Sequence, residues 1–194
     1  FNYAQSFISI LLWLMITSLV FYLFPAPKFY FLIIAIAGIA LSLFVVIKVK
    51  DTLTRLLGPS LIAFVCLILL LNTHVFPYIF SYQAPPKAAR YFTENAGETD
   101  KLYNYKYGQY ELFFYSEPQA IQLKTKADLK LATETKGSWI FTDHEGIIDF
   151  EALQLKTDTI IEYKHLYLNR GGRFINPKTR DQVLQPMYLI KLPN

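Results

Sequence analysis

Charge is almost absent from the first 82 residues of this sequence. The Lys, Arg, Asp and Glu residues in that stretch are Lys28, Lys48, Lys50, Asp51 and Arg55. The stretch from Lys87 to Asn194, in contrast, has the charged and polar composition of an ordinary soluble domain. The sequence therefore predicts two domains with different solvent preferences, a membrane domain over residues 1–82 and a soluble domain over residues 83–194.

The soluble part also lacks an excess of positive charge. Of the formal net charge of +4, four cations minus one anion place +3 before Tyr82, which leaves +1 for the rest of the chain. A domain that binds nucleic acid would concentrate Lys and Arg on its own surface. Nucleic acid is therefore not an expected partner.

Several kinds of chemistry lack the residues that they need. The single cysteine, Cys66, lies in an apolar run, which excludes an intrachain disulfide and a thiolate metal cluster. Residues 143–145 (Asp-His-Glu) have no second histidine at metal-ligand spacing, so a helix N-cap at Asp143 is the favoured interpretation. No Gly-x-Ser-x-Gly motif occurs, and Gly171-Gly172 is not followed by a helix pattern that would bind phosphate. We predict no catalytic residue, no cofactor-binding residue and no metal site.

Three apolar stretches are long enough to cross a lipid bilayer, which needs about 20 mainly apolar residues in a helix. They cover residues 7–24, 29–47 and 56–80. Prolines at 25 and 27 end the first stretch, and Lys48 and Lys50 end the second. The third is expected to begin near Leu56, with Pro59 in its first turn. The lipid bilayer is thus the first predicted partner.

The two short loops between these stretches predict an orientation. The Lys48–Arg55 loop contains three cations, whereas the Pro25–Lys28 turn contains one. Because short cytoplasmic loops retain Lys and Arg, we expect the Lys48–Arg55 loop in the cytoplasm. The Pro25–Lys28 turn and the domain after Tyr82 are then extracytoplasmic, in a protein that crosses the membrane several times. His74 is expected at the exit interface rather than as a proton relay.

The soluble part alternates between helix and strand patterns. Helices are predicted over 87–95, 109–115, 128–133 and 150–154, and strands over 101–105, 119–123, 138–142, 159–168 and 187–192. Such alternation indicates a small α/β domain with a mixed, mostly parallel sheet. The last two strands, separated by turn residues, are expected to form an antiparallel edge hairpin.

A basic cluster surrounds the expected turn between those last strands, with the members Arg170, Arg173, Lys178 and Arg180. Guanidinium groups bind phosphate in a bidentate manner, so the cluster is a candidate contact for a lipid headgroup or a lipid-linked phosphate. The alternative is a solvated cationic loop balanced by Asp158 and Asp181.

Tyrosines are frequent between residues 103 and 110, and Tyr107 and Tyr110 are candidates for stacking on a sugar ring. The alternative is that they are ordinary strand and core aromatics.

Four segments together resemble one enzyme family. They are residues 76–78 (Phe-Pro-Tyr), 85–91 (Pro-Pro-Lys-Ala-Ala-Arg-Tyr), 110–116 (Tyr-Glu-Leu-Phe-Phe-Tyr-Ser) and 139–142 (Trp-Ile-Phe-Thr). With the apolar spans, they resemble the C-terminal end of bacterial membrane glycosyltransferases of the dolichyl-phosphate-mannose protein mannosyltransferase and lipid A aminoarabinose transferase type. The resemblance implies many spans, a polyprenyl-phosphate sugar donor, and a C-terminal domain that covers the active site on the outer face of the membrane.

The family's catalytic acidic residue lies in an early extracytoplasmic loop, but the outward Pro25–Lys28 turn contains no carboxylate. We therefore interpret the chain as the last spans and the cap of a longer enzyme, inactive without its N-terminal transmembrane helices. No cofactor is identified, and the resemblance leaves open whether the full enzyme needs a divalent metal. The alternative is a non-enzymatic, membrane-anchored exported module that binds a ligand or partner.

Overall fold

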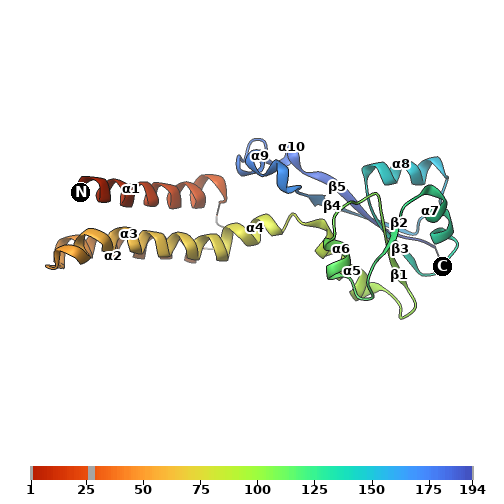
Figure 1. Cartoon of the computed structure of the whole chain (residues 1–194), viewed down its shortest axis with the longest axis horizontal. Helices are drawn as coiled ribbons and strands as arrows, with labels where there is room; N and C mark the ends of the chain where they lie inside the picture. The colour runs from red at the N-terminus through yellow and green to blue at the C-terminus, as the bar shows by residue number, and fades with distance from the viewer. Residues whose placement is uncertain (1, 26–28, 194) are drawn as a thin grey trace. The chain divides into compact units, whose positions relative to one another are not determined.

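The computed structural model describes residues 2–25 and 29–193, without the side chains of Asn2, Tyr3 and Leu168. Figure 1 labels its helices and strands. Residues 26–28 of the expected outward turn lie outside the described part. The chain forms two compact units: a helical unit, which runs up to Ser81 and also contains Gly172–Asp181, and an α/β unit, which contains Tyr82–Gly171 and the residues from Gln182 onward.

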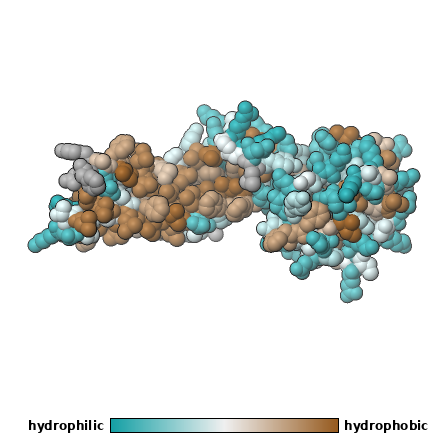
Figure 2. Space-filling model, viewed as in Figure 1, coloured by the Kyte–Doolittle hydropathy of each residue, from teal (hydrophilic) through white to brown (hydrophobic). Residues whose placement is uncertain are grey.

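Three long helical segments make up most of the helical unit. They are α1 (Asn2–Ser18) continued by η1 (Leu19–Leu23), α2 (Tyr30–Lys48), and α3 (Thr52–Leu70) continued by η2 (Leu71–Val75) and α4 (Phe76–Phe80). The stretches Ala4–Leu23, Tyr30–Lys48 and Thr52–Phe80 are long and apolar enough to cross a membrane. Figure 2 shows apolar side chains, in brown, over these helices. The three predicted apolar helices are confirmed.

The start of the third helix differs from the prediction. The Asp51 carboxylate accepts a hydrogen bond from the backbone N–H of Thr54 at 2.7 Å, so α3 begins at Thr52 rather than near Leu56. Pro59 consequently lies inside the helix and not in its first turn. Arg55 belongs to the first turn of α3 rather than to a loop.

The three helices approach one another closely at Gly38. A Cβ atom added there would lie 2.6 Å from the Trp13 ring and 2.7 Å from the Cys66 sulfur. Small residues at such positions let helices pack at short distance where burial of apolar surface gives no advantage over lipid. The helices therefore form a specific bundle.

The α/β unit contains a five-stranded sheet. Its strands are β1 (Lys101–Tyr105), β2 (Ile121–Leu123), β3 (Ser138–Asp143), β4 (Thr159–His165) and β5 (Gln185–Lys191), in the order β2-β1-β3-β5-β4. Strands β2, β1 and β3 are parallel, whereas β5 is antiparallel to both β3 and β4. The predicted mixed sheet with an antiparallel pair at one edge is confirmed.

Helices cover both faces of this sheet. The helices are α5 (Ala84–Asn95), α6 (Glu111–Tyr115), α7 (Lys126–Thr133) and α8 (His144–Ala152). Phe92 of α5 and Leu112 of α6 belong to one buried core, whereas Leu129 of α7 and Phe150 of α8 belong to the core on the opposite face. Because side chains alternate across a strand, strands β1, β3 and β5 contribute to both cores.

Two segments differ from the sequence prediction. Helix α8 begins at His144, well before the predicted start at 150, because the Asp143 carboxylate caps it by accepting the Gly146 N–H at 3.0 Å; the N-cap interpretation of Asp143 is confirmed. The expected hairpin turn over Arg170–Arg180 instead forms three short helices, η3 (Leu168–Arg170), α9 (Gly171–Ile175) and α10 (Arg180–Val183). Residues Gly172–Asp181, which we call the insert, pack with the apolar helices.

Candidate functional site

The carboxyl ends of β1 and β3 form the topological switch point of the parallel strands. The connection that leaves β1 carries α6 on one face of the sheet, and the connection that leaves β3 carries α8 on the opposite face. Ligands of open α/β sheets bind where connections diverge in this way, outside the carboxyl ends of the strands. The residues that end these strands, Tyr105 and Asp143, therefore mark a candidate site.

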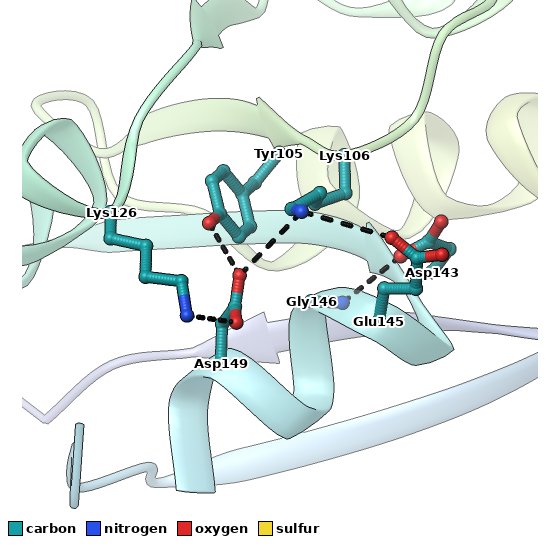
Figure 3. A network of polar contacts seen from close by, with 7 residues as sticks. All are labelled: Tyr105, Lys106, Lys126, Asp143, Glu145, Gly146 and Asp149. Atoms are coloured by element: carbon teal, nitrogen blue, oxygen red, sulfur yellow. Dashed lines mark hydrogen bonds and ion pairs between the residues drawn. The ribbon is translucent and has the colours of Figure 1, made fainter. Parts of the chain in front are cut away.

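A network of polar contacts occupies this switch point (Figure 3). The Asp149 carboxylate is 7% exposed, and it accepts a hydrogen bond from the Tyr105 hydroxyl at 2.7 Å. Its other oxygen lies 2.7 Å from the Lys126 ammonium, and Lys106 Nζ lies 3.8 Å from Asp149 and 3.7 Å from Glu145. The network joins the end of β1, the first turn of α7 and helix α8.

The electrostatics of the network fix its protonation state. Hydrogen bonds from Lys126 and Tyr105 hold the pKa of the Asp149 carboxyl below its usual range. Burial, reinforced by the hydrogen bond to Asp149, raises the pKa of the Tyr105 hydroxyl far above its usual value. Asp149 is thus an anion and Tyr105 a neutral donor at neutral pH. Hydrogen bonds and ion pairs engage these groups with one another, so they hold the switch point together and supply no free nucleophile.

An amide pair ties together the ends of β1 and β2. Asn104 is fully buried, and its side-chain N–H donates to the Tyr107 carbonyl oxygen at 2.9 Å and to Gln122 Oε1 at 2.8 Å. Gln122 Nε2 donates back to the Asn104 carbonyl oxygen at 3.1 Å. These bonds hold the loop after β1 in one conformation beside the sheet.

Two open hollows lie along that loop. Both include Gly108, Gln109 and Tyr110; one extends along α6 to Phe114 and Tyr115, and the other extends to Gln122 and Lys124. Tyr110 is 84% exposed and Phe114 is 82% exposed. Exposed aromatic rings beside amide groups provide both a stacking face and hydrogen-bond partners for a sugar ring. Tyr110 thus has the exposure that its predicted role requires.

Tyr107 does not have that exposure. It is 2% exposed, its ring packs edge-on against Phe141 and His165, and its hydroxyl lies within hydrogen-bond distance of Gln109 and Glu111. Burial also raises the pKa of its hydroxyl. The prediction that Tyr107 stacks on a sugar is wrong, because no ring face is free; the alternative of a core aromatic holds.

The predicted basic cluster is divided by the structure. Arg180 is 7% exposed, and its guanidinium donates to the Phe174 carbonyl oxygen at 3.0 Å, to the Tyr78 hydroxyl at 2.9 Å and to the Leu23 carbonyl oxygen. The rings of Phe24, Tyr78 and Phe174 surround it at 5.0, 5.0 and 5.1 Å from their centres. Arg180 is therefore a structural group of the helical unit and is not accessible to phosphate.

The other three members of the cluster, Arg170, Arg173 and Lys178, are exposed. Arg173 and Lys178 lie in the insert of the helical unit, whereas Arg170 belongs to the α/β unit. Their contact with lipid phosphate remains a prediction.

The polar network at the switch point was not predicted from the sequence. Nothing in the local sequence distinguishes Lys106, Lys126 and Asp149 from exposed surface charges. Only the strand order brings them together. Among the described residues, no group of three or more His, Cys, Asp or Glu side chains is placed to hold a metal ion. No protein-family model, curated protein or solved structure matches the chain.

Proposed function

We propose that this chain is the C-terminal part of a membrane glycosyltransferase that takes a sugar from a polyprenyl-phosphate donor, and that its α/β unit caps the outward-facing active site. The proposal combines the segment resemblance with the helices that are long and apolar enough to cross a membrane. It places the protein in the bacterial cytoplasmic membrane with the α/β unit on the periplasmic side.

The observation that carries the proposal is the path of the chain between its two units. The chain passes from one unit to the other at 81–82, returns at 171–172, and leaves again at 181–182. At the first crossing, α4 ends at Phe80 and α5 begins at Ala84, so the link is short. A ligand-binding domain on an anchor needs one connection to it. Three connections suit a cap that works together with the membrane helices.

The insert between β4 and β5 strengthens this argument because it is firmly bound within the helical unit. Phe174 is 1% exposed there, and Arg180 is held by backbone carbonyls and by three aromatic rings. A solvated loop between two adjacent strands would need neither a buried phenylalanine nor a buried guanidinium. Two buried side chains therefore hold the insert, which connects β4 to β5, within the helical unit.

Within the proposed enzyme, the hollows beside Tyr110 and Phe114 are the part of the α/β unit best suited to contact a sugar or a glycosylated acceptor. Stacking on exposed rings holds a sugar without requiring a charged group. The matched charges of the neighbouring network would keep the loop in place while the ligand is exchanged.

A transfer assay tests the proposal. The full-length protein that contains this chain would be reconstituted in liposomes with a labelled polyprenyl-phosphate sugar, and release of polyprenyl phosphate would be measured. We expect turnover by the full-length protein and none by residues 1–194 alone, because the sequence of the expected outward turn, Pro25–Lys28, contains no carboxylate. Turnover by residues 1–194 alone would contradict the cap role, and a full-length protein that leaves every such donor intact would contradict the transferase.

The second candidate function is a membrane-anchored module that binds a ligand without transforming it. The switch point and the adjoining hollows favour it, because they provide a binding surface without a nucleophile. Equilibrium binding of soluble oligosaccharides to the detergent-solubilised chain, with no donor turnover by the full-length protein, would support this function over the transferase.

A further inference from the structure

Another hollow lies within the helical unit, among α1, α2 and the first turns of α3. Its volume is about 320 Å³. Its polar lining includes Ser6, Ser9, Thr52 and Arg55, and its apolar lining includes Ile10 and Leu56. It therefore joins a cationic, hydroxyl-bearing part to an apolar wall.

Arg55 brings an uncompensated charge to this hollow. Asp51 is the only acidic residue among the first 82 residues, and its carboxylate is engaged with the Thr54 N–H at 2.7 Å. Within residues 2–25 and 29–193, the Arg55 side chain has no ion pair and no hydrogen bond. Lys48 and Lys50 lie close to it in the sequence, so this end of the helical unit carries an excess of positive charge. A guanidinium in that setting favours a bidentate anionic partner.

Two of the hydroxyl groups that line the hollow, those of Ser6 and Ser9, lie on one helix. Ser6 and Ser9 are three residues apart on α1, a spacing that brings side chains to the same face of a helix. Gln5 of α1 donates to the Ser60 hydroxyl of α3 at 2.6 Å, which fixes α1 against α3 beside the hollow. The wall is therefore held together by a specific contact between helices.

We infer that this hollow binds the phosphate group of an anionic membrane lipid. The Arg55 guanidinium pairs with the phosphate oxygens, the Ser6 and Ser9 hydroxyls donate to them, and the first part of an acyl chain lies against Ile10 and Leu56. Basic pockets between transmembrane helices on the cytoplasmic side bind anionic headgroups. A free anion would leave the apolar wall in contact with water, so a phospholipid fits both parts of the hollow.

The test compares lipid retention in charged and neutral bilayers. The chain would be placed in nanodiscs of phosphatidylcholine with and without phosphatidylglycerol, and bound lipid would be counted by native mass spectrometry after transfer to detergent. We expect the wild-type chain to retain phosphatidylglycerol and the Arg55→Gln variant to retain it roughly tenfold less, because the variant loses the charge-assisted hydrogen bonds to the phosphate. The double variant Ser6→Ala/Ser9→Ala should show a smaller loss and leaves the charge unchanged.

Lys50→Gln is the matched control, because it removes one cation from the same end of the unit but does not line the hollow. It should retain phosphatidylglycerol like the wild type. Equal retention by the wild type and Arg55→Gln would overturn the proposal, as would an equal loss in Lys50→Gln, which would indicate general surface attraction. Inorganic phosphate added to phosphatidylcholine nanodiscs should not raise the midpoint of thermal unfolding; a rise that depends on Arg55 would assign the hollow to a free anion instead.

Discussion

The Arg180 guanidinium donates a hydrogen bond to the carbonyl oxygen of Leu23, across 157 positions of the sequence. Leu23 is the last residue of the first apolar helical segment, where carbonyl groups lack partners within the helix. His74 satisfies the next carbonyl, since its Nε2 lies 2.7 Å from the oxygen of Phe24. Side chains from two distant segments thus cap one helix end, and a cation is favourable at that position.

Replacement of Arg180 should therefore detach the insert from the helices. We expect Arg180→Ala to lower the free energy of unfolding of the helical unit by about 2–4 kcal/mol, because it leaves buried carbonyls without donors. The measurement is thermal unfolding in detergent, combined with limited proteolysis within residues 172–181. Arg173→Ala, at an exposed position of the same insert, is the control and should change stability by less than about 0.5 kcal/mol. Equal protease resistance of Arg180→Ala and the wild type would contradict this role.

His165 should make the α/β unit sensitive to mildly acidic pH. The ring is completely buried, its Nδ1 accepts the Ala84 N–H at 3.2 Å, and burial lowers its pKa to about 4. Between the unfolded pKa of about 6.5 and this value, the unfolded chain binds a proton that the folded chain does not. The contribution of His165 to the free energy of unfolding should thus be fully present above pH 6.5. The free energy of unfolding should fall by roughly 3 kcal/mol as the pH approaches 4. Chemical denaturation at a series of pH values measures this slope.

His165→Asn provides the control for this pH dependence, because an amide oxygen can replace Nδ1 as the acceptor for Ala84 but does not titrate. The variant should be less stable at neutral pH and should lack the slope between pH 6.5 and 4. A slope equal to that of the wild type would assign the effect to other groups.

The Asp149 carboxylate should matter much more than its neighbour Glu145. Asp149→Asn keeps an acceptor for Tyr105 but removes the charge that faces Lys126, so we expect a loss of about 1–3 kcal/mol. Because the pKa of Asp149 is lowered, its contribution is present above the unfolded pKa of about 3.9 and disappears as the pH falls below it, outside the window of His165. Glu145→Gln, with a side chain 75% exposed, should be nearly neutral. Equal effects of the two substitutions in urea unfolding would contradict this ranking.

Tyr110 and Tyr107 should behave oppositely when they are replaced. Tyr110→Ala should leave folding unchanged and reduce kcat/KM of the full-length protein for its sugar donor or acceptor about tenfold, because it removes an exposed stacking face. Tyr107→Ala should destabilise the α/β unit by about 3–5 kcal/mol, as expected for a buried aromatic residue. Parallel transfer assays and unfolding curves separate the two effects. Unchanged transfer by Tyr110→Ala would exclude the stacking role.

Local sequence predicted most elements of the fold. Strands β1 and β3 were predicted nearly at their observed bounds, because short apolar runs between turn residues have few alternatives. The insert was not predicted: its glycines and Asn176-Pro177 indicate turns locally, whereas Phe174 and Arg180 obtain their partners from helices far away in the sequence.

The site was less predictable than the fold, and two tyrosines show why. Tyr107 and Tyr110 are three residues apart, yet one is buried and the other is exposed. Lys106 adopts a positive φ of 63°, which ends the regular alternation of β1 and turns Tyr107 into the core. Alternation cannot be extrapolated past such a residue. The contact between Lys126 and Asp149 likewise depends on tertiary structure, since each residue alone resembles an ordinary surface charge.

Labelling of single cysteines in intact cells tests the orientation on which the proposed function depends. In a Cys66→Ser background, one variant would carry Lys50→Cys and the other Lys136→Cys, at exposed positions of the helical and the α/β unit respectively. A membrane-impermeant maleimide should label position 136 in intact cells and position 50 only after the cells are permeabilised. Labelling of position 50 but not of position 136 in intact cells would place the α/β unit in the cytoplasm and contradict the account.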